Sequence, residues 1–341
     1  MKTIKTLLAA FIFLGIVSCN EQQKTEEENN KIMKKEMETK NDKQLNEQQL
    51  GALTILAQGL STPPRTPILK TPADLGMTYE EVEFTTADNV IIKGWFIPAN
   101  SNKIVISNHF SPGNRYGFAG HLEGMDFAGG FEVDFIPRYK ALHDAGYNIL
   151  TYDLRSHGES GDGEGKISGV GYYEWQEVLA SLKFAENKIE NSEISIMSMC
   201  MGANATINAM EKKPEAFKDV HSLILAQPLK GLTTIQKQCG NFGIPVEEGV
   251  EAFEPIYNKI TGLSIEDHDI TKKIKYINIP TLYLQVRNDM NSSEEDVKWM
   301  YDHTNVEDKD IIWVEDTPWR FKGYTYFSEH PEQMIQWLNK F

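Results

Sequence analysis

The sequence predicts an α/β fold in which a mostly parallel, eight-stranded sheet is flanked by helices. From about residue 77 the 341-residue chain alternates short β-rich segments with segments of helical spacing. That alternation is typical of strands joined by crossover helices. Hydrophobic residues make up 40% of the chain and aromatic residues 10%, which is enough to build one large core.

The strands and helices follow one another in a regular order. Residues 81–85 alternate polar and apolar, Asp88 and Asn89 supply a turn, and residues 90–96 complete a predicted antiparallel hairpin. Further strands are predicted at residues 103–107, 148–152, 194–197, 223–226, 281–286 and 311–314. Helices are predicted at residues 137–145, 172–188, 203–212, 294–303 and 331–338. Functional groups are then expected where parallel strands end.

One insertion interrupts this alternation. Residues 231–275, between the sixth and seventh strands, have helical character and are candidates for a lid over the ends of the strands. Their larger apolar side chains are candidates for an apolar ceiling over a site, with Cys239 as a packing residue: Phe242, Phe253, Tyr257 and Leu263.

The first residues predict export and a lipid anchor. Lys2 and Lys5 precede an apolar run over residues 7–17, so residues 1–18 are predicted to be a signal peptide. The run is shorter than the roughly 20 apolar residues that span a bilayer. Its end, I-V-S-C at Cys19, resembles a bacterial lipobox. That resemblance implies cleavage before Cys19, acylation of this cysteine (palmitate, for example) and a membrane location in the cell envelope. The alternative is an ordinary cleaved signal in which Cys19 is incidental.

A tether connects this anchor to the folded part. Residues 20–49 are polar and contain no aromatic residue, whereas residues 50–60 predict a docking helix that ends before Pro63. The expected organisation is a signal peptide (1–18), a flexible tether and docking helix (19–60) and a folded domain (61–341). The formal net charge of −15 argues against a nucleic-acid partner, since phosphate binding needs clustered Lys and Arg.

The most informative motif is S-x-C-x-G at residues 198–202, in a strand–turn–helix context. Small residues at Ser198 and Gly202 are a steric need where a strand and a helix nearly collide. Cys200 would lie at the amino end of the helix, where the helix dipole favours a thiolate. The motif resembles the nucleophile elbow of α/β-hydrolases, usually G-x-S-x-G. It is similar to the dienelactone hydrolase-like members, which carry cysteine there. The alternatives are a buried structural cysteine and Ser198 as the nucleophile.

The resemblance covers residues 82–341 and implies roles for further residues. The D-x-R-S-H-G stretch that starts at Asp153 resembles a structural turn of the family, which makes His157 a scaffold residue. The backbone N–H groups of Phe110 and Met201 would form the oxyanion hole, and His109 would brace that loop. Asp289, after the seventh strand, would be the catalytic acid in the family order of nucleophile, acid and histidine. The other interpretation of Asp289 is a turn residue that caps the next helix.

The histidine of such a triad is not in its usual place. In the family it follows the eighth strand by a few residues, but residues 314–322 contain none. His330 comes later, and a long loop over residues 320–330 would let it fold back to reach Cys200. The alternatives are a surface histidine at a helix start and an incomplete triad.

Substrate contacts are predicted at Arg115, which suits a carboxylate, and at Trp319, which suits an apolar group. Arg138 is a further candidate for the carboxylate, and either arginine could equally be a solvated surface residue. No spacing typical of a metal site and no phosphate-binding glycine loop occurs in the sequence, so no cofactor is expected.

The expected function is hydrolysis of a carboxylic ester, lactone or thioester through an acyl-Cys200 intermediate. The expected partners are a small-molecule substrate and, through the lipid anchor, a membrane. Two alternatives stay open at this point. One is a weakly active or inactive hydrolase-fold lipoprotein that serves as a binding module. The other is a cysteine-dependent peptidase or acyltransferase on the same fold.

Overall fold

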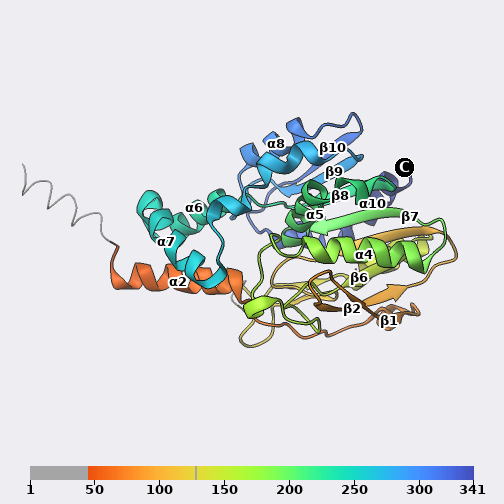
Figure 1. Cartoon of the computed structure of the whole chain (residues 1–341), viewed down its shortest axis with the longest axis horizontal. Coiled ribbons are helices and arrows are strands. Elements are labelled where there is room, and N and C mark those ends of the chain that lie inside the picture. The colour runs from red at the N-terminus through yellow and green to blue at the C-terminus, as the bar shows by residue number, and fades with distance from the viewer. Residues whose placement is uncertain (1–44, 127–128) are drawn as a thin grey trace, which may run out of the picture. The chain divides into compact units, whose positions relative to one another are not determined.

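The computed structural model describes residues 45–126 and 129–341, and it is built on one eight-stranded sheet (Figure 1). The strand order is β1-β2-β6-β3-β7-β8-β9-β10. Strand β2 runs antiparallel to both of its neighbours, and the other neighbouring pairs are parallel. The strands are β1 (Glu80–Thr85), β2 (Ile91–Ile97), β3 (Lys103–Asn108), β6 (Asn148–Tyr152), β7 (Glu193–Met199), β8 (Val220–Ala226), β9 (Thr281–Val286) and β10 (Lys309–Val314). The predicted strands and the hairpin are confirmed.

The glycine-rich segment between β3 and β6 contains a small ribbon that the sequence analysis did not anticipate. Strands β4 (Gly117–Ala119) and β5 (Glu132–Asp134) pair antiparallel as a separate two-stranded sheet. Both strands are only three residues long, which is why alternation of polar and apolar residues could not reveal them.

Helices cover both faces of the main sheet and bury an apolar core on each. One core joins the sheet to α4 (Trp175–Lys188), α5 (Met201–Lys212), α8 (Glu294–His303) and the 3₁₀ segments η4 (Pro214–Phe217) and η6 (Ile270–Tyr276). The other core joins it to α3 (Ile136–Asp144), α9 (Phe321–Glu329) and α10 (Pro331–Leu338). Burial of these apolar side chains is the main stabilising term for such a layered fold.

The segment predicted as a lid is a helical insertion. It consists of α6 (Gly231–Asn241), α7 (Val246–Thr261) and η5 (Ile265–His268), and α6 packs against both of the others. Phe253 and Tyr257 are buried and stack with their ring centroids 5.3 Å apart. Phe242, expected in the same ceiling, is 48% exposed and does not belong to it.

The docking helix predicted near residue 50 is α2 (Glu47–Ser61). Its Leu53 and Ala57 are fully buried. Leu60 lines a small apolar pocket of about 40 Å³ together with Ile235, Phe253 and Tyr257 of the insertion. The helix therefore packs beside α6 and α7, as Figure 1 also shows.

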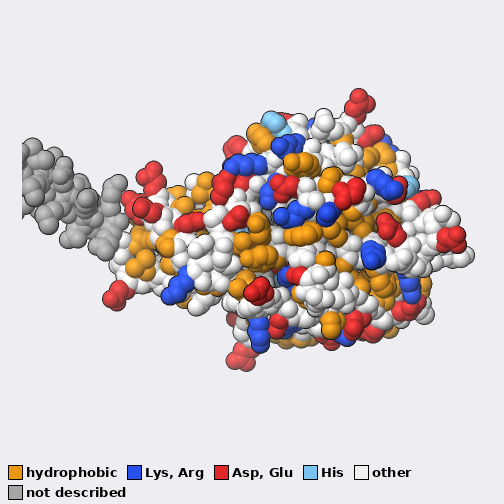
Figure 2. Space-filling view, viewed as in Figure 1, with side chains coloured by type: hydrophobic (Ala, Val, Ile, Leu, Met, Phe, Trp, Pro, Cys, Tyr) orange, Lys and Arg blue, Asp and Glu red, His pale blue; other side chains and the backbone are white. Residues whose placement is uncertain are grey.

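Residues 48–341 form one compact unit. Nearly all of α2 thus belongs to the unit that holds the sheet. The predicted signal peptide and Cys19 lie outside the described residues. Among the residues described, no helix is long and apolar enough to cross a bilayer. Figure 2 shows acidic and basic side chains interspersed over one face of the sheet-bearing unit.

One expected loop is wrong. Residues 320–330, predicted as a loop that folds back over the sheet, form helix α9 over Phe321–Glu329. Tyr324 and Phe327 are buried on one side of that helix. The spacing of three residues between Phe321, Tyr324 and Phe327 is a helical pattern, and it determines the conformation of this segment.

Candidate active site

Cys200 occupies a strained turn between β7 and α5. Its backbone has φ 50° and ψ −110°, a conformation that costs a non-glycine residue free energy and recurs at functional sites. Its N–H donates to the carbonyl of Ala226 at 2.8 Å, and its side chain is only 5% exposed. A Cβ added at Gly202 would lie 2.7 Å from the Cβ of Asn108. The steric argument for a small residue two positions after Cys200 is therefore confirmed.

Ser198, the alternative nucleophile, is occupied elsewhere. It is fully buried at the end of β7, where its hydroxyl accepts a hydrogen bond from Asn108 Nδ2 at 2.8 Å. The same hydroxyl lies 2.8 Å from Thr206 Oγ1 on α5. These bonds fasten the strand to the helix behind the turn and leave Cys200 as the residue that projects from it.

Asp289 lies in the loop after β9, as the family order implies. Its carboxylate accepts from Gln285 Nε2 at 2.9 Å and from the N–H of Asn291 at 2.6 Å. It is 1% exposed and forms an ion pair with Arg320. Two donors and a cation thus surround this buried carboxylate, which satisfies its hydrogen-bonding needs.

Arg320, which follows β10, stands where a triad histidine was expected. Each of its three nitrogens has a partner: Nη1 donates to Asp289, Nη2 to the carbonyl of Gln227, and Nε to Tyr324 Oη at 2.6 Å. Burial by itself lowers the pKa of Arg320, but the charges of Asp289, Tyr324 and Cys200 raise it above its usual value. The guanidinium is therefore a permanent positive charge within electrostatic reach of Cys200.

Tyr324 connects the arginine to the cysteine. Burial raises the pKa of Tyr324 well above its usual value, and the charge of Cys200 and a side-chain hydrogen bond with it raise this pKa further, against the effect of Arg320. The Tyr324 ring stacks on Phe110 with centroids 4.0 Å apart and planes 9° from parallel. The site is thus a chain of contacts from Cys200 through Tyr324 and Arg320 to Asp289.

Sequence reasoning missed both Arg320 and Tyr324. The family order implies a histidine after β10, and no motif of the family implies an arginine there. The signal that could have found the pair is its spacing of four residues. In a helix that spacing places two side chains side by side.

His330 is not brought to this site. Its imidazole lies at the junction of α9 and α10, where it is half-exposed, packs on the ring of Tyr326 at 4.7 Å and faces Glu332. Because residues 321–329 are helical, the chain does not fold back as that prediction required. All eight histidines of the chain belong to the described part, and none of them interacts with Cys200 there. Each ring has its contacts with other residues: His109, His121, His143, His157, His221, His268, His303 and His330.

The loop after β3 is braced as expected. His109 donates from Nδ1 to the carbonyl of Phe110 at 2.8 Å, and its Nε2 accepts from the N–H of Leu154 at 2.9 Å. Burial, followed by the charge of His157, lowers the pKa of His109 to about 3, so this imidazole is neutral.

The predicted oxyanion hole includes the N–H of Met201, the first residue of α5. The first N–H groups of a helix have no hydrogen-bond partner within that helix. The oxyanion role of the Phe110 and Met201 N–H groups stays a prediction.

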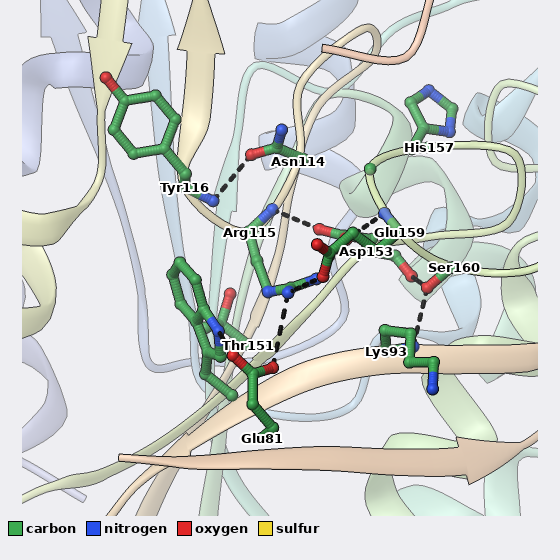
Figure 3. Close-up of polar contacts among 12 residues, drawn as sticks. Glu81, Lys93, Asn114, Arg115, Tyr116, Thr151, Asp153, His157, Glu159 and Ser160 are labelled. Atoms are coloured by element: carbon green, nitrogen blue, oxygen red, sulfur yellow. Dashed lines mark hydrogen bonds and ion pairs between the residues drawn. The ribbon is translucent and has the colours of Figure 1, made fainter. Parts of the chain in front are cut away.

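Arg115 is not available to a substrate, contrary to the sequence-based expectation. Figure 3 shows it beside Asp153 and Glu81, at the turn after β6. It is 2% exposed and donates to Asp153 at 2.5 Å and to Glu159. Its guanidinium also lies 4.8 Å from the ring centre of Trp95. Both terminal guanidinium nitrogens are thus engaged by carboxylates, only Nε is left without a partner, and the buried cation holds the turn together.

That turn has the structural role which the family resemblance implied. A Cβ added at Gly158, whose φ is 46°, would lie 2.1 Å from the carboxylate of Asp153. His157 lies 2.8 Å from the carbonyl of Arg155 through Nδ1 and 3.1 Å from Ser111 Oγ through Nε2. Both nitrogens are occupied within the scaffold.

Two other candidate contacts differ in their surroundings. Trp319 is 46% exposed next to Arg320, and its ring lies 3.4 Å from where a Cβ on Gly129 would be; its role in substrate binding stays a prediction. Arg138 is fully buried, donates to Ser107 Oγ at 3.0 Å and lies 4.1 Å from the ring centre of Phe135. Among the residues described, no group of three or more His, Cys, Asp or Glu side chains could hold a metal ion.

Comparison with known proteins identifies the fold. No family model and no curated protein matches the sequence. An esterase from Pyrococcus furiosus superposes with a TM-score of 0.64 and 24% identity over 83% of this chain and 98% of its own. A second crystal form of that esterase gives 0.61 and 25% identity over 82% and 98%. An esterase from Exiguobacterium antarcticum, at 15% identity, gives 0.51 over 76% and 98%. Together with the strand order, these likenesses show that the chain has the α/β-hydrolase fold.

Proposed function

We propose that this protein is a hydrolase of carboxylic esters, lactones or thioesters that forms an acyl intermediate on Cys200. The observation that carries the proposal is the contact of a strained elbow cysteine with Tyr324, whose hydroxyl accepts a hydrogen bond from the buried cation Arg320. A structural cysteine needs neither backbone strain nor a neighbouring charge. Both are useful to a nucleophile.

The chemistry follows from these neighbours. The Cys200 thiolate attacks the acyl carbon, and the positive charge of Arg320 and the hydroxyl of Tyr324 stabilise the thiolate before attack and after expulsion. The N–H groups of Phe110 and Met201 stabilise the oxyanion of the tetrahedral intermediate. Removing one such donor typically costs about 3 kcal/mol of transition-state stabilisation. Asp289 and Gln227 hold the guanidinium in place.

Esterases among the structural neighbours support an ester-like substrate class. Two of them have that description, and each is covered along 98% of its length. At these identities the shared feature is the fold. The assignment to acyl chemistry therefore rests on the site of this chain.

The test is hydrolysis of short p-nitrophenyl esters by the purified domain, with and without prior treatment by iodoacetamide. Activity should disappear on alkylation and in Cys200→Ala. The matched control is Cys239→Ala, which removes the other buried free cysteine of the described residues. Activity that survives both alkylation and Cys200→Ala would exclude the cysteine mechanism.

A second candidate function has one specific observation in its favour. Arg320 occupies the place of the base, and a guanidinium cannot accept a proton. A hydrolase fold without a base suits a binding module. Absence of turnover on a broad ester panel, with ligand binding that survives Cys200→Ala, would favour that function.

We also propose that the protein is anchored to a membrane of the cell envelope through lipid on Cys19. The support is the charged start, the short apolar run and the I-V-S-C sequence. A polar segment then separates Cys19 from α2. Two or more acyl chains give stable anchoring where one does not.

A further inference from the structure

We propose that the acyl donor of this site is a thioester, because its leaving group departs without a proton. This inference rests on the proposed function and narrows its substrate class. It follows from what surrounds Cys200: a nucleophile and a positive charge are present, but none of its described neighbours has a proton that is not already committed to another contact.

Arg320 cannot be the proton donor. Its three nitrogens are committed to Asp289, the Gln227 carbonyl and Tyr324 Oη. Its neighbours also raise its pKa above a value that is already beyond physiological pH.

Tyr324 is a poor donor for a related reason. Its pKa is raised well above the usual value, first by burial. Its hydroxyl already accepts from Arg320 and is hydrogen-bonded to Cys200. The single phenolic proton is therefore committed to Cys200 and is not free for a leaving group.

The histidines cannot supply the proton either. In the described part of the chain, the histidines of the family-like motifs are His109 and His157. Each uses both ring nitrogens within the scaffold. The site thus lacks an imidazole that could give a proton to a departing group.

The consequence depends on the leaving group. When a thiolate attacks an alkyl ester, the tetrahedral intermediate can expel the thiolate or an alkoxide. The alkoxide is a far stronger base, so without a proton donor the intermediate returns to the ester. With a thioester, both groups that the intermediate can expel are thiolates. The Cys200 sulfur bonds to the acyl carbon, the bond from that carbon to the substrate sulfur breaks, and the electron pair of this bond leaves on the substrate thiolate.

Hydrolysis of the acyl-Cys200 intermediate also expels a thiolate. Water adds its oxygen to the acyl carbon, the bond to Cys200 breaks and the sulfur leaves as a thiolate. The products are the carboxylate and the thiol, with the remaining proton passing to solvent. No oxidant, reductant or metal takes part in either step.

The experiment uses one acyl group on three leaving groups: ethyl butyrate, p-nitrophenyl butyrate and the butyryl thioester of N-acetylcysteamine. Acylation of Cys200 is followed by intact mass and turnover by product release. We expect kcat/KM for the thioester to exceed that for the ethyl ester by about 100-fold or more, the usual contribution of general acid catalysis. Hydroxide hydrolyses the two at similar rates, so the ratio reports the enzyme.

A matched pair of variants tests the physical reason. Arg320→His places an imidazole next to Asp289 and should raise the ethyl ester rate relative to the thioester rate by about tenfold or more. Arg320→Gln removes the guanidinium without adding an imidazole and should give no such gain. Thermal melting shows whether each variant is folded, and the wild-type ratio decides the question if either is not.

The outcomes separate the two proposals. Acylation of Cys200 by ethyl and thiol esters at rates within tenfold of each other overturns the thioester inference and leaves the proposed function standing. Failure of all three donors to acylate Cys200 overturns the proposed function itself.

Discussion

At the scale of single residues, the presence of Arg320 where the family has a histidine determines what the site can do. A histidine in that place would accept the proton of the nucleophile and later return it. Arg320 instead contributes a fixed positive charge, held by Asp289 on one side and by Tyr324 on the other. Cysteine is the nucleophile that tolerates this exchange, because its thiolate does not need a base at the moment of attack.

Removing that charge should slow the reaction of Cys200 with iodoacetamide. We expect Arg320→Met to lower the alkylation rate at pH 7 by about tenfold or more, because roughly 1.4 kcal/mol of interaction between the thiolate and a nearby cation corresponds to a factor of ten. The rate is measured by mass spectrometry over a pH series. Arg287→Met, at a partly exposed arginine paired with Glu294 and Glu315, is the control. Equal rates in wild type and Arg320→Met would contradict this electrostatic role.

His109 should make the fold sensitive to acid. Its folded pKa of about 3 lies below the ordinary 6.5, so the unfolded chain binds the proton more readily. Its contribution to stability is therefore complete above pH 6.5 and is lost as the pH falls towards 3. For this group alone the loss between pH 7 and pH 5 is about 2 kcal/mol.

The measurement is urea unfolding of wild type and His109→Gln at both pH values. The variant should lose less stability than the wild type on going to pH 5, by about the same 2 kcal/mol. A pH dependence that is identical in the two proteins would show that His109 is not buried as a neutral group.

Residue roles were predictable where a local motif determined them. The place of Cys200 at the turn, the small residue at Gly202 and the bracing role of His109 follow from short patterns, because sterics at the elbow act over a few residues. Arg115 was predicted wrongly because its carboxylate partners lie far away in the sequence, the Asp153 side chain being 38 positions on. No pattern of neighbouring residues reveals such a pair.

At the scale of elements, periodicity predicted the sheet well and failed for one segment. Strands β6 and β9 and helices α8 and α10 have the predicted bounds, since each shows regular spacing of apolar residues. The segment of helix α9 was predicted as a loop, because only a loop would let His330 reach Cys200. The aromatic spacing that forms α9 also brings Tyr324 to Cys200.

Helix α2 should contribute to the stability of the sheet-bearing unit. Leu53 is fully buried, whereas Ile55 on the same helix is 71% exposed. We expect Leu53→Ala to lower the free energy of unfolding by about 2–4 kcal/mol and Ile55→Ala to change it by less than about 0.5 kcal/mol. Urea titrations of the two variants decide the matter. Equal effects would show that α2 is not docked.

At the scale of the whole molecule, the order of segments suggests an enzyme held close to a membrane. The predicted signal peptide and polar tether precede α2, the first helix of the folded unit. The net charge of −15 gives the chain no electrostatic attraction to anionic lipids. The lipid on Cys19 would therefore carry the anchoring.

The membrane proposal makes a direct prediction for the full-length chain. In a bacterial host the wild type should sediment with membranes and stay there in high salt, because acyl chains bind by the hydrophobic effect. Cys19→Ser should leave the membrane fraction, while Cys239→Ser, which removes a buried cysteine of α6, should not. Membrane association of Cys19→Ser that survives a salt wash would contradict a lipid anchor at this residue.

The claim on which the rest of the account depends is that Cys200 carries the acyl group. The most direct measurement is an acid quench of the protein during turnover of p-nitrophenyl butyrate, followed by peptide mapping. We expect a single butyryl group on the peptide that contains Cys200, and no adduct and no turnover in Cys200→Ser. A butyryl group on a different residue, or steady turnover by Cys200→Ser, would contradict the account.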